Sequence, residues 1–326
     1  MATREDVAKL ARVSGATVSF VVNDSKNVSP EVRERVLAAI AELDYHPNLV
    51  GRSLVKKKTN HVAILVDNLR NPHYCEMLEG AQQLACEKDY IVSILMTSVS
   101  NIKTVADLIG RGVDGAILTQ LETEAAAYLR KRMPCVGLDS HVKVDYRSAV
   151  FSLIECLKEH GHREIVFLGG LPLDETNARY IYFCAAMKEY GLNVDPRLVH
   201  GGMGDGRTDE QSGATAMKEI MSRGGDFTAV FALNDLMCIG AAVVLRAAGY
   251  KIPQDVSLAG CDNLKILNWF SMSLSSIEVF PFETGTALMK HLIETIQGIP
   301  SAKRVIKCEF LKKESITRAQ RRLVSA

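Results

Sequence analysis

The chain has 326 residues, of which 47% are hydrophobic and 24% are charged, and its formal net charge is +1. These values describe an ordinary globular protein of two or more domains. No run of 18 apolar residues occurs and the N-terminus is charged and amphipathic, so we expect neither a membrane span nor a secretory signal, and a cytoplasmic location.

The eight cysteines are scattered through apolar segments and include no Cys-x-x-Cys pair. In a reducing compartment such cysteines are small hydrophobic core residues, so we expect no metal site and no cofactor.

Two short helices are predicted before residue 24. Thr3 and Ser14 are the expected N-caps, because a hydroxyl can accept a hydrogen bond from a free amide of the first turn. The apolar residues recur at helical spacing, with Val7, Leu10 and Ala11 in the first helix and Val18, Val21 and Val22 in the second.

A third helix is predicted to begin at Ser29-Pro30-Glu31, with serine as the cap and proline at the first helical position. Its apolar face consists of Val32, Val36, Ile40 and Leu43. Helices this short must pack together as a small bundle, which leaves the second helix free to present its polar edge. This arrangement is typical of a helix-turn-helix.

Three motifs make the prediction specific. They are the run from Asp6 to Asn23, the third helix with Tyr45-His46-Pro47-Asn48 behind it, and Gly51-Arg52-Ser53-Leu54 followed by three lysines. In these motifs the chain resembles the LacI/GalR family of bacterial transcriptional regulators, and the resemblance runs through almost the whole chain. It implies a repressor that binds a palindromic operator in double-stranded DNA as a homodimer. The charge agrees, because residues 1–60 hold ten Lys and Arg against seven Asp and Glu.

The resemblance also implies which residues contact DNA. They are Ser14, Gly15, Ala16, Thr17, Ser19, Phe20 and Asn23 in the headpiece, and Asn48, Arg52, Ser53 and Leu54 in the hinge. The family's base readers fall at Gly15, Ala16 and Phe20, whose side chains cannot form hydrogen bonds, so we expect weak discrimination through contact with thymine methyl groups. Phe20 packed in the headpiece core is the alternative. Leu54 is expected to wedge between base steps in the minor groove and kink the duplex.

From His61 onward, short strands rich in Val, Ile and Leu alternate with helices, which predicts two doubly wound parallel sheets covered on both faces. The resemblance implies a two-lobe α/β domain like that of periplasmic binding proteins, with a first crossover near Gly161-His162. The expected domains are an all-α helix-turn-helix headpiece at 1–46, a hinge helix and linker at 47–60, and an effector-binding and dimerisation domain at 61–326. One lobe is expected at 61–161 and 280–302, and the other at 162–279 and 303–326.

A small-molecule effector is expected outside the carboxyl ends of the strands. The resemblance places it on Tyr74, Asp139, Arg179, Asn234, Asp262 and Trp269. Arg and Asp side chains bond to vicinal hydroxyls and an aromatic face covers a sugar ring, so we expect a carbohydrate. Alternatives stay open for Asp235 as a helix N-cap, for Asp67 and Asp139 as caps or ligands, and for Trp269 as a core residue. Cys261 stands where the family usually has tyrosine, which predicts a differently shaped site.

Two other functions remain as alternatives: a nucleobase-responsive regulator of the corepressor type, and a sugar-binding receptor without a DNA role. The receptor leaves residues 1–58 unexplained. An enzyme is not expected, because Gly202-Met203-Gly204-Asp205-Gly206 lacks the full dinucleotide spacing and no Ser, His and Asp stand in a nucleophile motif. His160 and His162 have no third ligand nearby, so zinc is not expected either.

Overall fold

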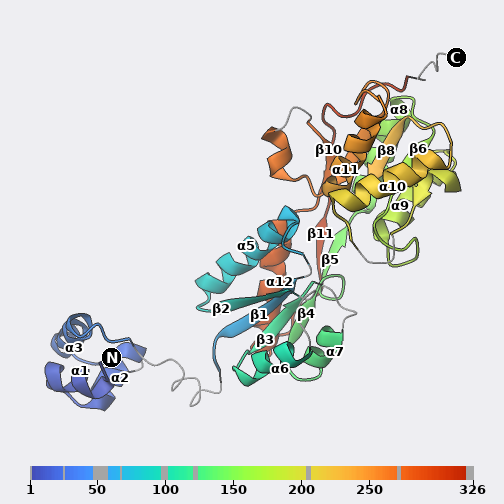
Figure 1. Ribbon diagram of the computed structural model, residues 1–326. Coiled ribbons are helices and arrows are strands. Elements are labelled where there is room, and N and C mark those ends of the chain that lie inside the picture. The colour runs from blue at the N-terminus through green and yellow to red at the C-terminus, as the bar shows by residue number, and fades with distance from the viewer. Residues whose placement is uncertain are drawn as a thin grey trace. The chain divides into compact units, whose positions relative to one another are not determined.

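The computed structural model of the chain describes residues 2–24, 26–46, 58–66, 68–96, 102–119, 124–202, 207–269 and 273–320. The chain divides into two compact units, residues 1–59 and 60–326, whose elements are drawn in Figure 1. None of the helices in these ranges is long and apolar enough to span a bilayer.

The first unit contains three helices, α1 (Arg4–Ala11), α2 (Gly15–Asn23) and α3 (Pro30–Glu42). The two predicted caps are confirmed. The Thr3 side chain accepts from the Asp6 amide while the Asp6 carboxylate accepts from the Thr3 amide, and Ser14 accepts from the Thr17 amide. Ser29 stands at the N-cap of α3, but its side chain makes no capping bond.

The core of this unit is small and aliphatic. Its buried residues are Val7, Ala8, Ala11, Val18, Val21, Val36 and Ala39. Leu10 is 43% exposed, so its expected place on the buried face was wrong. The face of α1 that carries Val7 and Ala11 already fills the space against α2 and α3, and an eight-residue helix has room for only one such face.

The second unit contains two lobes, and the first is built on a parallel sheet with the order β2-β1-β3-β4. Its elements are β1 (His61–Val66), α5 (Pro72–Glu87), β2 (Ile91–Met96), α6 (Ile102–Gly110), β3 (Gly115–Leu118), α7 (Glu124–Arg130), β4 (Cys135–Gly137) and α12 (Pro281–Ile296). Strand β1 is buried on both faces. Val62, Ile64 and Val66 share a core with α5 and α12, whereas Ala63 and Leu65 share a core with α6 and α7.

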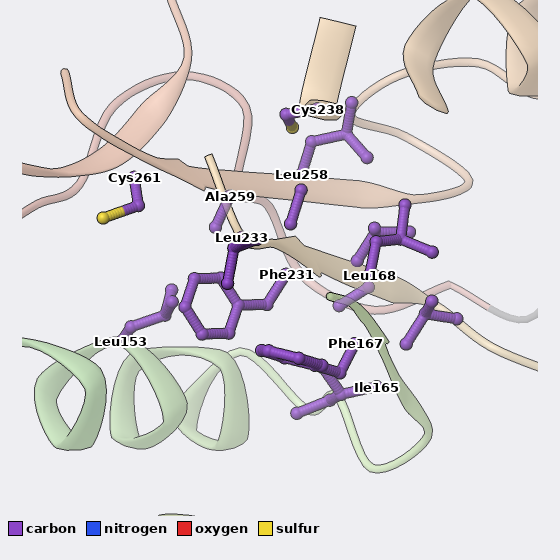
Figure 2. Close-up of a cluster of buried hydrophobic side chains, with 14 of the residues drawn as sticks. Leu153, Ile165, Phe167, Leu168, Phe231, Leu233, Cys238, Leu258, Ala259 and Cys261 are labelled. Atoms are coloured by element: carbon purple, nitrogen blue, oxygen red, sulfur yellow. The ribbon is translucent and has the colours of Figure 1, made fainter. Parts of the chain in front are cut away.

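The second lobe is built on a six-stranded sheet with the order β12-β10-β9-β8-β6-β7. It is parallel except for β12, which pairs antiparallel with β10. Its elements are α8 (Arg147–Glu159), β6 (Ile165–Leu168), α9 (Ala178–Glu189), η1 (Pro196–Leu198), β7 (Val199–His200), α10 (Glu210–Ser222), β8 (Ala229–Ala232), α11 (Asp235–Ala247), β9 (Ser257–Cys261), η2 (Lys265–Trp269), β10 (Ser275–Glu278) and β12 (Glu309–Leu311). Phe167 and Phe231 lie in its core with ring centroids 5.5 Å apart (Figure 2).

Two further strands, β5 (Val142–Asp145) and β11 (Arg304–Lys307), pair with each other in a two-stranded parallel ladder. Helix α8 follows β5, and Leu153 and Leu157 of this helix are buried in the core of the second lobe. The expected first crossover at Gly161-His162 was therefore wrong, because the chain changes lobe at β5, before α8. An apolar helix face predicts that a helix packs on a sheet, but it does not specify which sheet.

Candidate functional site

The outward face of α2 is the first candidate site. Val18 and Val21 are buried, while Ala16 is exposed and Gly15, Ser19 and Phe20 are half-buried. Ser14 holds the start of the helix, because its hydroxyl accepts from the Thr17 amide at 3.1 Å and pairs with the Thr17 hydroxyl at 2.9 Å. The second helix of a helix-turn-helix is the one that enters the major groove.

Phe20 lies outside the hydrophobic core of this unit. The Lys26 ammonium lies 4.6 Å from the centroid of the Phe20 ring. The alternative in which Phe20 packs in the headpiece core is therefore wrong. The ring belongs to the outward face of α2.

Asn23 closes α2 on the same side. Its side-chain amide donates to the Ser19 carbonyl at 2.7 Å and lies 3.1 Å from the Ser19 hydroxyl. Its Oδ1 atom is buried and has no hydrogen-bond partner among the described residues. The predicted hinge contacts Asn48, Arg52, Ser53 and Leu54 lie outside the described residues.

The second candidate site lies where the two lobes of the second unit meet. Arg179 stands in the first turn of α9, whose N-cap Asn177 accepts from the Tyr180 amide. The Arg179 guanidinium lies 4.8 Å from the centroid of the Tyr146 ring and donates to the Cys261 sulfur at 3.7 Å. Burial raises the pKa of the Cys261 thiol well above its usual value, so the thiol is neutral beside the cation.

Asp262 connects this group to the other lobe. It follows β9 with a φ of 111°, and the residue is buried, with 7% of its surface exposed. The Asn71 amide donates to Asp262 Oδ2 at 3.3 Å, and His73 Nδ1 lies 3.6 Å from Asp262 Oδ1. Both partners belong to the start of α5, where Asn71 also caps the helix. Tyr74, the predicted aromatic of this segment, lies edge-on to His73 with ring centroids 5.3 Å apart.

Asn234 and Asp235 stand at the start of α11. Asn234 is the N-cap of α11, where it accepts from the Met237 amide at 2.9 Å and donates to the Thr208 carbonyl at 2.8 Å. The expectation that Asp235 is this cap was therefore wrong by one residue. The amide of Asn234 is engaged within the protein at both its oxygen and its nitrogen.

Asp235 is fully buried and supports the loop that carries Asp262. Its carboxylate accepts from the Leu264 amide at 2.8 Å and from the Ser276 hydroxyl at 2.7 Å. Burial, and then the neighbouring Asp262, raise the pKa of Asp235 to about 8. Gly260 makes room for this carboxylate, because a Cβ at residue 260 would lie 2.1 Å from Asp235 Oδ1.

The remaining predicted residues are less closely associated. Asp139 follows β4 in a turn with a φ of 60°, and its own amide donates to the Val142 carbonyl at 2.7 Å. Its main-chain carbonyl accepts from Lys303. Trp269 ends η2, and its side chain lies outside the described part of the chain, as does Asp67.

The structure therefore brings Arg179 and Asp262 together with three residues that were not predicted, Asn71, His73 and Tyr146. Asn71 and His73 flank Pro72 immediately before Tyr74, so the sequence Asn71-Pro72-His73-Tyr74 could have predicted all three residues as site residues, whereas only Tyr74 was predicted. Within the described ranges, no group of three His, Cys, Asp or Glu could hold a metal ion. Both nitrogens of His162 are engaged, with the Thr228 hydroxyl and the Thr317 carbonyl, each at 2.9 Å.

A helix-turn-helix unit followed by a two-lobe α/β unit, with polar side chains where the lobes meet, defines a DNA-binding regulator with a ligand-binding domain. Comparisons with known proteins agree. Residues 3–48 match the family of bacterial regulatory proteins named after lacI, and residues 154–316 match the periplasmic binding protein-like domain. The chain belongs to the LacI family, whose members are not enzymes, and it is a DNA-binding transcriptional repressor.

Similar curated proteins cover 91–98% of the chain. The ribose operon repressor of Haemophilus influenzae is 30% identical over 91% of this chain and 93% of its own length. The HTH-type transcriptional repressor PurR of Pasteurella multocida is also 30% identical, over 94% and 95%. The repressor CytR of Escherichia coli strain K12 is 29% identical, over 98% and 97%.

Solved structures share the fold. The transcriptional regulator CelR in complex with cellobiose is 28% identical with a TM-score of 0.71, covering 97% of this chain and 100% of that one. The Lac repressor dimer bound to its operator and an anti-inducer has a TM-score of 0.84 at 23% identity, covering 97% and 99%.

Proposed function

We propose that a small molecule bound between the two lobes of the second unit controls the operator affinity of this repressor, and that the molecule is a sugar or a sugar derivative. One observation carries the proposal. Arg179 and Asp262 lie close together in the second lobe, and the Asp262 carboxylate accepts a hydrogen bond from Asn71 of the first lobe. A ligand that bonds to these side chains contacts both lobes, so its binding depends on how the lobes close.

The chemistry of these side chains suits a polyhydroxylated ligand. Guanidinium and carboxylate groups form strong, directional bonds to hydroxyl groups, and the rings of Tyr74 and Tyr146 can cover the apolar side of a sugar. The further proposed contacts are Asp139, Asn234 and Trp269. The ribose operon repressor and the complex of CelR with cellobiose support a carbohydrate by similarity.

On the DNA side, we propose that two copies of the chain bind a palindromic operator with α2 in the major groove. Ser14, Gly15, Ala16, Thr17, Ser19, Phe20 and Asn23 are the proposed headpiece contacts. Within the hinge and linker at 47–60, the segment from Asn48 to Leu54 would form a short helix that carries the proposed contacts Asn48, Arg52, Ser53 and Leu54. This helix would be stable only on DNA, because an isolated helix of about seven residues does not fold. Ligand binding would bias this coil-to-helix equilibrium by on the order of 1 to 3 kcal/mol.

A nucleobase is the second candidate ligand of this site. A thermal-shift screen of sugars and nucleobases against the full-length protein separates the two classes. A ligand at 100 times its Kd stabilises a protein by roughly 2.7 kcal/mol, which gives a clear shift. Arg179→Ala should abolish the shift of the true effector, and an effector that still shifts this variant would contradict the proposed site.

A further inference from the structure

The recognition helix α2 has no charged side chain. Its sequence is Gly-Ala-Thr-Val-Ser-Phe-Val-Val-Asn, and at its N-terminal end Gly15 and Ala16 offer no hydrogen-bonding side chain. Yet the N-terminal residues of such a helix are the ones that meet base edges. The commonest specific contact to a base is a bidentate pair from arginine to guanine O6 and N7. If this repressor makes such contacts, the donors must come from outside α2.

The Arg4 side chain lies beside Gly15. A Cβ at residue 15 would lie 3.4 Å from Arg4 Nε and 3.9 Å from Arg4 Cζ, so the guanidinium is in van der Waals contact with the place where a side chain of residue 15 would begin. Arg4 is the first residue of α1, and its side chain is 52% exposed. Its ion pair with Glu5, at 3.0 Å, is solvent-exposed, with the Glu5 side chain 71% exposed, so solvent screens the pair and DNA can replace it.

Lys26 likewise places a positive charge beside a residue of α2, here Phe20. It lies beyond the C-terminus of α2, and its ammonium lies 4.6 Å from the centroid of the Phe20 ring. The face of an aromatic ring attracts a cation at this distance. Gly15 and Phe20 lack a polar side chain, and each has a positively charged side chain from outside α2 beside it: Arg4 beside Gly15 and Lys26 beside Phe20.

We propose that Arg4 and Lys26 supply the polar base contacts that Gly15 and Phe20 cannot make. Arg4 presents its guanidinium fork to guanine O6 and N7. Lys26 donates to a guanine beside a thymine whose methyl group contacts the Phe20 ring. Gly15 and Phe20 are five residues apart, about 7.5 Å along the helix axis, so the two cations read different base pairs.

The test uses the full-length protein and an operator selected from random palindromic duplexes. Binding of Arg4→Ala, Arg4→Lys and Lys26→Ala is measured against the operator and all its single-base-pair variants at fixed salt. Arg35→Ala is the matched control, since it removes one exposed positive charge from α3. Arg4→Ala and Lys26→Ala should each bind the operator about 10- to 100-fold more weakly and lose discrimination at one base pair, a different one for each.

Arg4→Lys separates charge from geometry. It should keep the affinity for unrelated DNA but discriminate less than the wild type at the base pair where Arg4→Ala loses discrimination, because an ammonium lacks the bidentate fork. Arg4→Lys also tests the proposal if Arg4→Ala does not fold. The Thr3 and Asp6 capping box that starts α1 remains in all three variants.

Two results would overturn the proposal. One is an equal loss of affinity by Arg4→Ala or Lys26→Ala for every operator variant, which is the behaviour of a phosphate contact. The other is unchanged discrimination. Gly15→Gln adds an internal check, because its side chain would begin in van der Waals contact with the Arg4 guanidinium and would compete with it for the same base edge. In that background Arg4→Ala should have no further effect, and additive losses would contradict the proposed arrangement.

Discussion

The side-chain amide of Asn71 donates a 3.3 Å hydrogen bond to Oδ2 of Asp262, across 191 residues of sequence. It links the start of α5 in one lobe to the end of β9 in the other. The same Asn71 accepts from the His73 amide at 3.0 Å, so one side chain both caps a helix and joins the lobes.

Asn71→Ser tests this link apart from the cap, because serine also caps a helix but is too short to replace the bond to Asp262. We expect effector affinity to fall about fivefold, as for the loss of roughly 1 kcal/mol of hydrogen bonding. Isothermal titration measures the change. Lys265→Ala is the control, since the ion pair between Lys265 and Glu76 also joins the lobes but its lysine side chain is 75% exposed, and we expect little effect. Equal losses in both variants would argue against a special role for Asn71.

Arg179→Ala and Leu54→Ala should have opposite effects. The first removes the guanidinium that lies against Tyr146 and Cys261 and should abolish the ligand response while operator binding without ligand persists. The second removes the proposed minor-groove wedge and should abolish specific operator binding while ligand affinity persists. Calorimetry and mobility-shift assays on both variants provide the comparison. Unchanged operator binding by Leu54→Ala would mean that the hinge mechanism is wrong.

Asp235 should make the stability of the second unit depend on pH. Its pKa of about 8 in the folded protein exceeds the unfolded value of about 3.9, so the folded state retains a proton that the unfolded state has lost. The stabilisation is complete below pH ~4 and is lost as the pH rises toward 8, with a slope of at most about 1.4 kcal/mol per unit.

Asp235→Asn is the matched variant for this prediction. Asparagine resembles the protonated carboxyl group, since it can accept from the Leu264 amide and donate to the Ser276 hydroxyl. In urea unfolding between pH 5 and 8, the wild type should lose stability relative to this variant as the pH rises. Parallel curves would show that Asp235 titrates at its ordinary value.

Gly260→Ala should destabilise the second lobe by about 1 to 3 kcal/mol, the usual cost of forcing extra atoms into a packed interior. A Cβ there would lie 2.1 Å from Asp235 Oδ1 and 3.1 Å from Asp235 Cα, so the helix itself would have to move. Gly110→Ala is the control, because a Cβ at the end of α6 would meet nothing within 4 Å. Thermal unfolding of both variants is the measurement, and equal melting temperatures would contradict the close approach.

The features that the sequence predicted well depend on neighbours along the chain. Thr3 and Ser14 bond to amides three residues away, and the first strand, β1, begins at His61, where the predicted alternation of strands and helices starts. Such features are set by local chemistry, which a single sequence contains.

The features that were missed depend on residues distant in sequence. Helix α8 belongs to the second lobe because Leu153 packs in the core of that lobe, together with Phe167 and Phe231. No residue of α8 itself specifies which of the two sheets the helix packs on. Asp235 rather than Asn234 was expected to be the cap, because both residue types cap helices and the choice depends on Ser276 and Leu264. Arg4 beside Gly15 could not be predicted either, since it depends on how α1 packs on α2.

The most direct test of the account is the operator affinity of the full-length wild type and of Arg179→Ala, measured as a titration with the ligand that the thermal-shift screen identifies. We predict that the ligand changes the wild-type operator Kd by about 5- to 150-fold, and that Arg179→Ala binds the operator equally well with and without it. A ligand that binds tightly between the lobes and leaves the wild-type operator Kd unchanged would contradict ligand control of this repressor.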